Sequence, residues 1–376
     1  MKVVFLSNFL LHHQTEYCEE MYSLCEGNFF FVATSPITDE RKKLGYHDYS
    51  QDNIPYYIDG TDDTNHERIV NLIREADSVM IGSAPWHWVE ERVRDGKLVY
   101  IYSERIFKTL ISSVKTILRG TVSTRFIKAG KNQNVKLFCA SAYLPKEMKW
   151  LHTFRNRMYR WGYFPPLFPK SETVKLEELP TIVFAGRLIA WKRPWYVLQL
   201  AKYFIDKGIE AKFIVVGTGN LEDKLRSYVQ KHGLSDCVTF TGALPPNEVR
   251  RYMEQGDIFL FTSTKEEGWG AVLNEAMNSG CAVVASDKIG SVPFLIKDGE
   301  NGLMFSDGSF RDLKKKVISL CNNAELTEKM GEKAYETIRS MWNGKTAAQR
   351  YVILTECFLK GKDTPFEDGP CSKVEK

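Results

Sequence analysis

Short runs of apolar residues alternate along the whole chain with stretches in which apolar residues recur at helical spacing. The short runs are typical of strands buried on both faces of a parallel sheet, and the helical spacing indicates amphipathic helices that cover such a sheet. The sequence therefore predicts an α/β protein with parallel sheets. The predicted strands cover 2–7, 29–33, 78–82, 98–102, 135–140, 181–185, 212–216, 238–241, 258–262 and 282–286. The predicted helices include 15–25, 67–76, 221–232, 246–255 and 310–321.

Length and one proline-rich stretch divide the chain. A chain of 376 residues is longer than one hydrophobic core usually serves, which favours two domains. Residues 163–180 contain four prolines and no periodic pattern, so we interpret them as a linker. We predict a Rossmann-like domain over 1–164, a linker over 165–180, a second Rossmann-like domain over 181–340, and a helix and tail over 341–376 that cross back to the first domain. We expect the polar residues 360–376 to be loose or draped on the surface.

Charge is distributed very unevenly. The net charge of +4 combines a balance of −9 in residues 1–96, +13 in residues 97–170 and zero in residues 171–376. A block as basic as residues 97–170 indicates an anionic partner. Nucleic acid is disfavoured, because no recognition motif accompanies the charge.

The same sequence features bear on the compartment. No stretch approaches the roughly 18 to 20 apolar residues that span a bilayer, and we interpret the amino-terminal apolar run as a buried strand and not as a signal peptide. The eight cysteines form no CxxC pair. These observations predict a cytoplasmic protein with reduced cysteines.

The basic block contains a segment, 105–119, with two interpretations. Its apolar residues Ile106, Leu110, Val114 and Ile117 recur at helical spacing, which fits an ordinary amphipathic helix packed on its own core. The surrounding positive charge favours the alternative, a helix that lies on the anionic inner face of the cytoplasmic membrane. Aromatic residues nearby either add to such a membrane face or pack at the linker: Trp150, Tyr159, Trp161, Tyr163 and Phe164.

Two carboxylates, Glu267 and Glu275, form the most informative pattern. Glu267 is predicted on a loop broken by Gly268 and Gly270, and Glu275 inside the helix that follows. A strand end, a glycine-rich turn and a helix amino terminus together present backbone N–H groups to an anion such as phosphate. If the intervening segment is largely helical, the two carboxylates are roughly 12 Å apart, about the reach of a nucleotide-diphosphate-sugar. Two solvated surface glutamates are the ordinary alternative, but the adjacent glycines favour a site.

A second candidate anion site opens the second half of the chain. The predicted strand 181–185 is followed by Gly186, Arg187 and, five residues after the arginine, Lys192. An arginine fork and a compact lysine charge at a strand end can both reach a diphosphate. Solvated loop cations are the alternative, which a second anion site in the same domain makes less attractive.

These motifs resemble those of retaining glycosyltransferase family 4, which has the GT-B fold of two facing Rossmann-like domains with a central cleft. The glutamate pair matches the family's two-glutamate signature, and its G-R-L-x-x-x-K pattern matches Gly186, Arg187, Leu188 and Lys192. The stretches 215–226, 238–249 and 290–303 are also similar, so the resemblance covers roughly 181–305. The opening of the chain, SNFLLHHQ, departs from the glycine pair of many members and is similar to some bacterial polysaccharide-assembly members.

The resemblance implies specific site residues in the second domain. Arg187 and Lys192 would neutralise the departing nucleoside diphosphate, Glu267 would contact the transferred sugar, and Glu275 would hold the ribose. Backbone amides from about Gly270 to Leu273 would cradle the phosphates. The implied donor-binding residues are Gly186, Gly217, Gly242, Gly268, Gly270, Ala271, Val272, Leu273 and Glu275. In the first domain, the candidate substrate contacts are His12, His13, His87 and Glu104, for each of which a structural role is the alternative.

The resulting hypothesis is a retaining glycosyltransferase that moves a sugar from a UDP-linked donor to a glycan acceptor in surface polysaccharide assembly. The basic block would suit a lipid-linked acceptor. No Asp-x-Asp motif occurs in the sequence, and the cationic pair can stabilise the leaving group, so we expect no metal or other cofactor. The alternatives are a nucleotide-sugar epimerase of the same fold, a transferase with a soluble acceptor, and a non-catalytic nucleotide-sugar-binding module. An NAD dehydrogenase is disfavoured because no GxGxxG follows the first strand.

Overall fold

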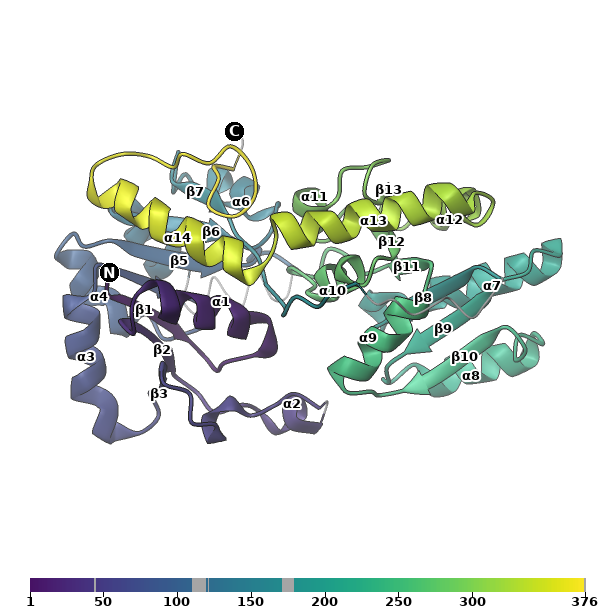
Figure 1. Cartoon of the computed structure of the whole chain (residues 1–376), viewed down its shortest axis with the longest axis horizontal. Helices are drawn as coiled ribbons and strands as arrows, with labels where there is room; N and C mark the ends of the chain where they lie inside the picture. Colours follow the sequence, from purple (N-terminus) through teal and green to yellow (C-terminus); the bar gives the residue numbers. More distant parts are fainter. Residues whose placement is uncertain (44, 110–119, 121, 171–178, 375–376) are drawn as a thin grey trace. The chain divides into compact units, whose positions relative to one another are not determined.

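A computed structural model describes residues 1–43, 45–109, 120, 122–170 and 179–374 of the chain. Contacts between residues divide it into two compact units. The first unit comprises Met1–Pro166 together with Met341–Lys376, and the second comprises Leu167–Ser340. Each unit is Rossmann-like, with a parallel sheet covered by helices (Figure 1).

The sheet of the first unit has seven strands in the order β3-β2-β1-β4-β5-β6-β7, and every strand pairs with its neighbours in parallel. The central strands are apolar and almost fully buried, as expected for strands covered on both faces. The strands are β1 (Val3–Ser7), β2 (Phe29–Ala33), β3 (Tyr57–Asp59), β4 (Ser78–Ile81), β5 (Val99–Ser103), β6 (Val135–Cys139) and β7 (Met158–Arg160).

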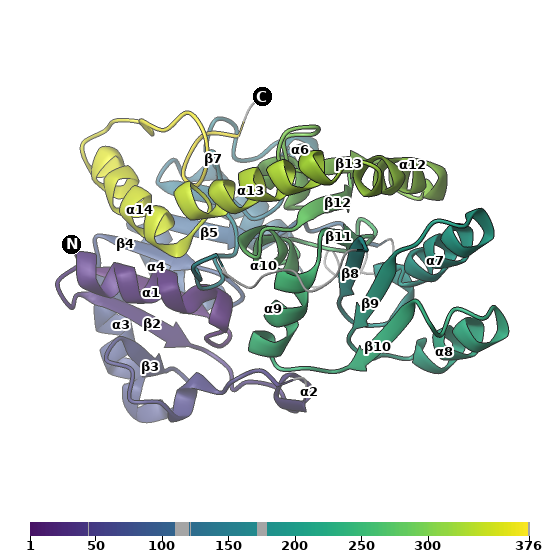
Figure 2. The same cartoon turned by 45° about the vertical axis from the view of Figure 1, so that its right-hand side comes forward.

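The helices of the first unit are α1 (His12–Leu24), α2 (Asp39–Lys43), α3 (His66–Glu75), α4 (His87–Arg94), α6 (Leu144–Trp150) and α14 (Gly344–Leu359), with short helical segments at Tyr49–Gln51, Asp63–Asn65, Val122–Lys128 and Ala129–Lys131. Helix α14 lies beside α1 (Figure 2). Helix α14 is also hydrogen-bonded to the sheet through hydroxyl groups. The Tyr351 hydroxyl lies 2.9 Å from Ser78 Oγ, and Thr355 Oγ1 lies 3.0 Å from the Tyr100 hydroxyl. The last helix of the chain therefore completes the first unit.

The sheet of the second unit has six parallel strands in the order β10-β9-β8-β11-β12-β13. The strands are β8 (Thr181–Ala185), β9 (Lys212–Val216), β10 (Val238–Gly242), β11 (Ile258–Phe261), β12 (Ala282–Ser286) and β13 (Leu303–Phe305). The helices are α7 (Trp195–Lys207), α8 (Glu222–Lys231), α9 (Pro246–Gln255), α10 (Val272–Asn278), α11 (Val292–Leu295), α12 (Phe310–Cys321) and α13 (Ala324–Ser340), with a short segment at Ala190–Lys192. Parallel pairing brings the carboxyl ends of β8, β9 and β11 to one edge.

The C-terminal tail is more ordered than the sequence suggested. Residues 371–374 run along β7, with the amide of Val374 donating to Met158 O at 3.1 Å and the amide of Arg160 donating to Ser372 O at 2.8 Å. Cys371 and Ser372 are fully buried. The expectation of a loose or surface-draped tail is therefore wrong for residues 371–372, and residues 371–374 hydrogen-bond to an otherwise unpaired strand edge.

The basic segment also differs from its prediction where the structure describes it. The expected helix from residue 105 is absent over 105–109, where the Glu147 carboxylate accepts the amides of Ile106 at 2.6 Å and Phe107 at 3.3 Å. Residues 110–119 lie outside the described residues. Burial by the surrounding chain raises the pKa of Glu147.

The nearby aromatic residues fall into two groups. The side chains of Tyr159, Trp161 and Phe164 are at most 2% exposed, so they pack in the first unit and cannot form a membrane face. Trp150 is 67% exposed, and its ring contacts Phe107 edge-on at 5.6 Å. Within the described ranges, no helix has the length and apolar character needed to cross a membrane.

Candidate functional site

Two cations follow β8 at the carboxyl edge of the second sheet. Arg187 is exposed, and Lys192 ends the short helical segment that follows. The ring of Trp191 lies 5.7 Å from the Arg187 guanidinium carbon and 4.8 Å from Lys192 Nζ. Both distances are within cation–π reach, so one indole holds the two charges at the same edge.

A glycine contact fixes the course of this loop. Gly217 follows β9 with a φ of 123°, and a Cβ there would clash with the carbonyl oxygen of Gly186. Leu188 then donates its amide to Thr218 O at 2.8 Å. The two strand ends approach so closely because Gly217 has no side chain.

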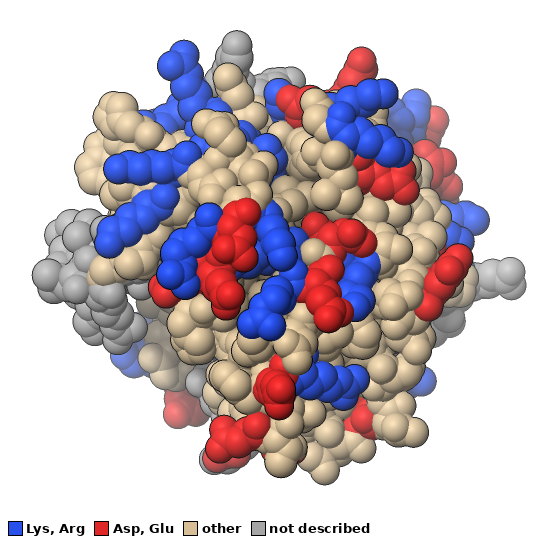
Figure 3. All heavy atoms as spheres, turned by 90° about the vertical axis from the view of Figure 1, so that its left-hand side faces the viewer, with Lys and Arg blue, Asp and Glu red and all other residues tan. Residues whose placement is uncertain are grey.

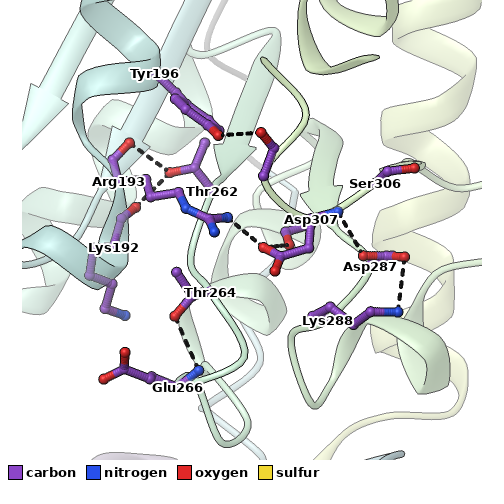
Figure 4. A network of polar contacts seen from close by, with 12 residues as sticks. Lys192, Arg193, Tyr196, Thr262, Thr264, Glu266, Asp287, Lys288, Ser306 and Asp307 are labelled. Atoms are coloured by element: carbon purple, nitrogen blue, oxygen red, sulfur yellow. Dashed lines mark hydrogen bonds and ion pairs between the residues drawn. The ribbon is translucent and has the colours of Figure 1, made fainter. Parts of the chain in front are cut away.

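The loop after β11 secures Lys192 from the other side (Figure 4). The hydroxyl of Thr262 donates to the backbone oxygen of Lys192 at 2.7 Å and lies 3.3 Å from that of Arg193. The amide of Thr264 donates to Trp191 O at 2.8 Å. Lys192 thus lies on a loop bonded to two neighbouring strand ends, which restricts where its charge can move.

Glu267 pairs directly with Lys192. The Lys192 ammonium donates to Glu267 Oε2, and the side chains of the pair are only 13% and 12% exposed. The buried hydroxyl of Ser263 donates to the same oxygen at 2.9 Å. The structure therefore joins two predicted residues that are 75 positions apart and adds Ser263, which no sequence motif indicated.

The segment between the two glutamates is anchored by Trp269. This side chain is fully buried, its indole N–H donates to Asn274 Oδ1 at 2.9 Å, and its carbonyl accepts from Ser291 Oγ at 2.6 Å. Gly270 has a φ of 84°, and a Cβ there would overlap the Phe261 ring. A glycine is therefore required at that position by both backbone conformation and packing.

Helix α10 begins only at Val272, so the segment from Glu267 is half loop. The 12 Å separation derived from a mainly helical segment does not apply. Glu275 lies in the first turn of α10, and Ala271 immediately precedes the helix. A helix of seven residues has a weak dipole field, so the side-chain cations are the main positive charge at this edge.

A further polar group, not predicted from the sequence, supports the same loop. Arg193 has a left-handed backbone with a φ of 52°, and its guanidinium donates to Asp307 Oδ1 at 2.5 Å. Asp287 in turn accepts the amide of Asp307 at 2.9 Å, and Tyr196 donates to Gly308 O at 2.9 Å (Figure 4). These residues hold the chain directly after Lys192. Arg193 and Asp307 are 114 positions apart, so their pairing left no local signal.

The remaining predicted donor residues lie at the same edge of this unit. Gly242 ends β10 and its carbonyl accepts the amide of Gly217 at 2.8 Å. Gly268 is buried in the loop after β11, and Leu273 is buried in α10. The predicted residues of the second unit therefore gather around the ends of β8 to β11.

The first unit brings three polar side chains together at the carboxyl ends of its strands. His13 stacks on Tyr163 with ring centroids 4.3 Å apart, and the Tyr163 hydroxyl donates to Glu104 Oε1 at 2.7 Å. Burial, and then the charges of His12 and Arg41, lower the pKa of His13 well below its usual value. His13 is therefore neutral at pH 7 and can accept or donate a hydrogen bond to a hydroxyl.

His87 does not join this group. It begins α4 and lines a separate cavity of about 170 Å³ between α3 and α4, together with His66 and Trp88. His12 lies beside His13, with ring centroids 5.4 Å apart. The structure thus groups His12, His13 and Glu104 but separates His87. In the described part of the chain, no three His, Cys, Asp or Glu side chains are grouped so as to hold a metal ion.

Comparison with known proteins agrees with this geometry. Residues 169–337 match the family model described as "Glycosyl transferases group 1", which is nearly the whole second unit. The chain is 31% identical over 179 residues to the uncharacterized glycosyltransferase MJ1069 of Methanocaldococcus jannaschii, covering 46% of this chain and 44% of that protein. It is 27% identical over 232 residues to the amylovoran biosynthesis glycosyltransferase AmsK of Erwinia amylovora, covering 57% of each.

The fold is similar to that of a solved structure over nearly its whole length. The crystal structure of Anabaena Alr3699/HepE in complex with UDP superposes with a TM-score of 0.72 at 17% identity, covering 96% of this chain and all of that one. The match in fold confirms the predicted GT-B fold class of two Rossmann-like domains, and the match to the glycosyltransferase family model covers the second unit. The chain spans about half the length of the curated relatives it matches.

Proposed function

We propose that this protein is a retaining glycosyltransferase that transfers a sugar from a UDP-linked donor to a glycan acceptor without a metal ion. The observation that carries the proposal is the group of Arg187, Lys192 and Glu267 at the carboxyl ends of β8 and β11. Ligands of doubly wound sheets bind at this edge. UDP is bound in the HepE structure, whose fold this chain shares, and this supports the choice of nucleotide.

The two cations suit a diphosphate leaving group. When the bond from the sugar C1 to the diphosphate oxygen breaks, the electron pair stays on that oxygen and negative charge develops there. Fixed positive groups aimed at such a position stabilise the transition state more than the ground state. Arg187 offers a bidentate fork and Lys192 a compact charge, and the loop bonds from Thr262 and Thr264 hold Lys192 in advance.

The carboxylates take separate positions in the proposal. Glu267 contacts hydroxyls of the transferred sugar while its other bonds, from Lys192 and Ser263, hold its carboxylate in place. Glu275, in the first turn of α10, holds the ribose hydroxyls. The amides of Gly270 to Leu273 contribute to the phosphate site as a minor element.

Retention follows from attack on the same face as departure. The acceptor hydroxyl oxygen forms a bond to C1 as the C1–diphosphate bond breaks, and its proton passes to the leaving diphosphate oxygen. The two bond changes occur together, or a short-lived ion pair forms between bond breaking and bond formation. The cations of the site supply the charge stabilisation that a divalent ion would otherwise supply.

The acceptor belongs to the first unit in this proposal, where neutral His13 and the Tyr163–Glu104 pair offer hydrogen bonds to a glycan. A glycan acceptor in polysaccharide assembly is supported by the relative AmsK, named for amylovoran biosynthesis.

Contact with the inner face of the cytoplasmic membrane, and with it a lipid-linked acceptor, is supported by the basic block 97–170 and the exposed ring of Trp150. Reduced cosedimentation of Trp150→Ala with phosphatidylglycerol vesicles would support this contact, and unchanged cosedimentation would contradict it.

The experiment that tests the proposal measures nucleoside diphosphate release from a panel of UDP-, GDP- and dTDP-sugars in EDTA. We expect slow release from one UDP-sugar by the wild-type protein and none above background by Glu267→Ala. A matched control is Glu254→Ala, which removes a carboxylate from an i,i+4 pair on α9 of the same unit. Loss of release in EDTA alone would contradict metal independence. Conversion of the donor to its epimer would favour the epimerase alternative.

A further inference from the structure

A second cavity lies at the opposite edge of the first sheet from His13 and Glu104. Its volume is about 900 Å³, within the range of small-molecule sites. Four of its lining residues, Asp77, Leu98, Asn134 and Arg157, immediately precede the neighbouring strands β4, β5, β6 and β7. We call it the amino-edge pocket. It lies entirely within the first unit.

The lining of the amino-edge pocket is strongly basic. Its lining contains seven cations and two carboxylates. Figure 3 views the side on which the strands of the first sheet begin, and Lys and Arg side chains surround a few acidic ones near the middle of this view. Burial and then the charge of Arg157 lower the pKa of Lys136, which is the direction expected of like charges held together. The cations are Arg92, Lys97, Lys136, Arg155, Arg157, Lys362 and Lys373, and the carboxylates are Asp77 and Asp363.

Two of the cations are fixed parts of the scaffold. Arg92 is 3% exposed and donates to the backbone oxygens of Ile73, Leu98 and Asp77 at 2.8 to 3.1 Å. Arg157 likewise donates to Val135 O at 2.9 Å and to two further backbone oxygens. Carbonyl oxygens satisfy their N–H groups but do not cancel their charge, so the pocket keeps a fixed positive field.

Two other cations, Arg155 and Lys362, are available to a ligand. Both are exposed, and no carboxylate in the described part of the chain forms an ion pair with either. Among the described residues, Lys136 donates one hydrogen bond, to Gln133 O at 2.9 Å, and its ammonium lies 4.6 Å from the centre of the Phe358 ring. An ammonium has three N–H groups to give. The pocket therefore combines a fixed field with movable donors.

The loop that presents Arg155 is held in an unusual backbone conformation. His152, Phe154 and Asn156 all have positive φ values, of 54°, 53° and 61°. Each such residue costs free energy and persists only where its surroundings impose it. The fully buried Phe154 anchors the loop, and Thr153 donates its hydroxyl to Phe126 O at 2.8 Å. Alternating left-handed residues thus direct Arg155 outward from a rigid base.

The C-terminal tail closes the other side of the pocket. Its pairing with β7 places Lys373 beside Asp363, with which it forms an ion pair, and the Tyr159 hydroxyl donates to Asp363 at 3.1 Å. Lys362 adjoins this pair. Strand ends and tail, distant in sequence, are thereby joined around one basic cavity.

We propose that the amino-edge pocket binds a phosphate-bearing anion, separately from the donor site of the second unit. A carboxylate ligand would bring one negative charge and two acceptor oxygens, whereas a phosphate group brings about 1.5 to 2 negative charges and three acceptor oxygens for arginine and lysine donors. The phosphate comes from a soluble phosphorylated molecule or from a lipid headgroup. The proposal does not depend on the transferase activity.

The test uses the full chain and two probes, inorganic pyrophosphate and vesicles of phosphatidylcholine with phosphatidylglycerol. Hydrogen–deuterium exchange is followed in peptides covering 152–158 and 360–374, so that pyrophosphate bound at 186–192 is seen separately. The variant is Arg155→Glu with Lys362→Glu. Its control is Arg68→Glu with Lys345→Glu, which makes the same charge change at exposed positions of the same unit.

We expect pyrophosphate to slow exchange in the pocket peptides, and the pocket variant to raise its Kd by more than about tenfold while the control does not. Protection by anionic vesicles and not by pyrophosphate, again lost in the pocket variant, identifies a lipid headgroup as the source. Absence of protection by either probe overturns the proposal, and so does equal protection in the pocket variant and the wild type.

Discussion

Replacing Lys192 with alanine lowers the rate of sugar transfer by about 10²- to 10³-fold, the cost of removing one preorganised charge-stabilising donor from an active site. The reason is geometric, because Lys192 lies on a loop tied to the ends of β9 and β11 and provides a compact charge for the leaving diphosphate. The measurement is steady-state release of UDP from the preferred donor, with Kd for UDP determined in parallel.

The matched control for this variant is Lys202→Ala. Lys202 lies on α7 of the same unit, and its pair with Asp206 is an exposed i,i+4 contact that contributes little. Loss of Lys192 also leaves the Glu267 carboxylate without its cation, so rates are compared well below the unfolding temperature of the variant. A Lys192→Ala rate within about twofold of the Lys202→Ala rate would remove Lys192 from the mechanism.

Replacing Trp269 with alanine lowers the free energy of unfolding by about 3–5 kcal/mol, the usual cost of removing a large aromatic side chain from a core. Trp269 is fully buried, and its loss also leaves Asn274 without the indole donor. Because Trp269 anchors the loop between Glu267 and α10, we expect donor binding to weaken as well. Urea denaturation followed by circular dichroism gives the change in stability.

Trp150→Ala is the control for Trp269→Ala, because it removes the same side chain from a position that is 67% exposed. Its expected effect is within about 0.5 kcal/mol, as for most surface substitutions. If the two variants unfold at the same urea concentration, the indole is not the anchor of this loop.

The sequence predicted the central strands almost to the residue. Phe29–Ala33, Thr181–Ala185, Lys212–Val216 and Ala282–Ser286 are continuous apolar runs because both faces of a central parallel strand are buried. The strands that were missed, β3, β7 and β13, have three residues each and lie at sheet edges. An edge strand pairs on one side only, so its composition carries a weaker signal.

The residues of the candidate site likewise divide into those that a strand-end motif predicted and those that no motif indicated. Arg187, Lys192 and Glu267 were predicted because each follows a recognisable strand in a fixed spacing. The structure brings Lys192 to Glu267, and the roles of the three residues stay predictions. Ser263 and the Arg193–Asp307 pair were missed because their partners come from other strand ends. The start of α10 at Val272 was missed because buried Trp269 and left-handed Gly270 hold the preceding residues in a loop.

The first unit shows where periodicity misleads. Residues 105–109 carry part of a helical pattern but are not helical in the structure. Residues 371–374 of the polar tail are fixed, because the edge of β7 offers them backbone partners. That contact comes from a distant part of the chain, and such contacts leave no periodic trace.

The central claim, that the carboxyl edge of the second sheet is the donor site, is tested most directly by calorimetric titration with UDP. We predict one site per chain, with binding weakened at least about tenfold in a variant that carries both Arg187→Ala and Lys192→Ala. The variant with Arg155→Glu and Lys362→Glu keeps wild-type affinity in this titration. Absence of UDP binding, or equal affinity in the double-alanine variant and the wild type, would contradict the account.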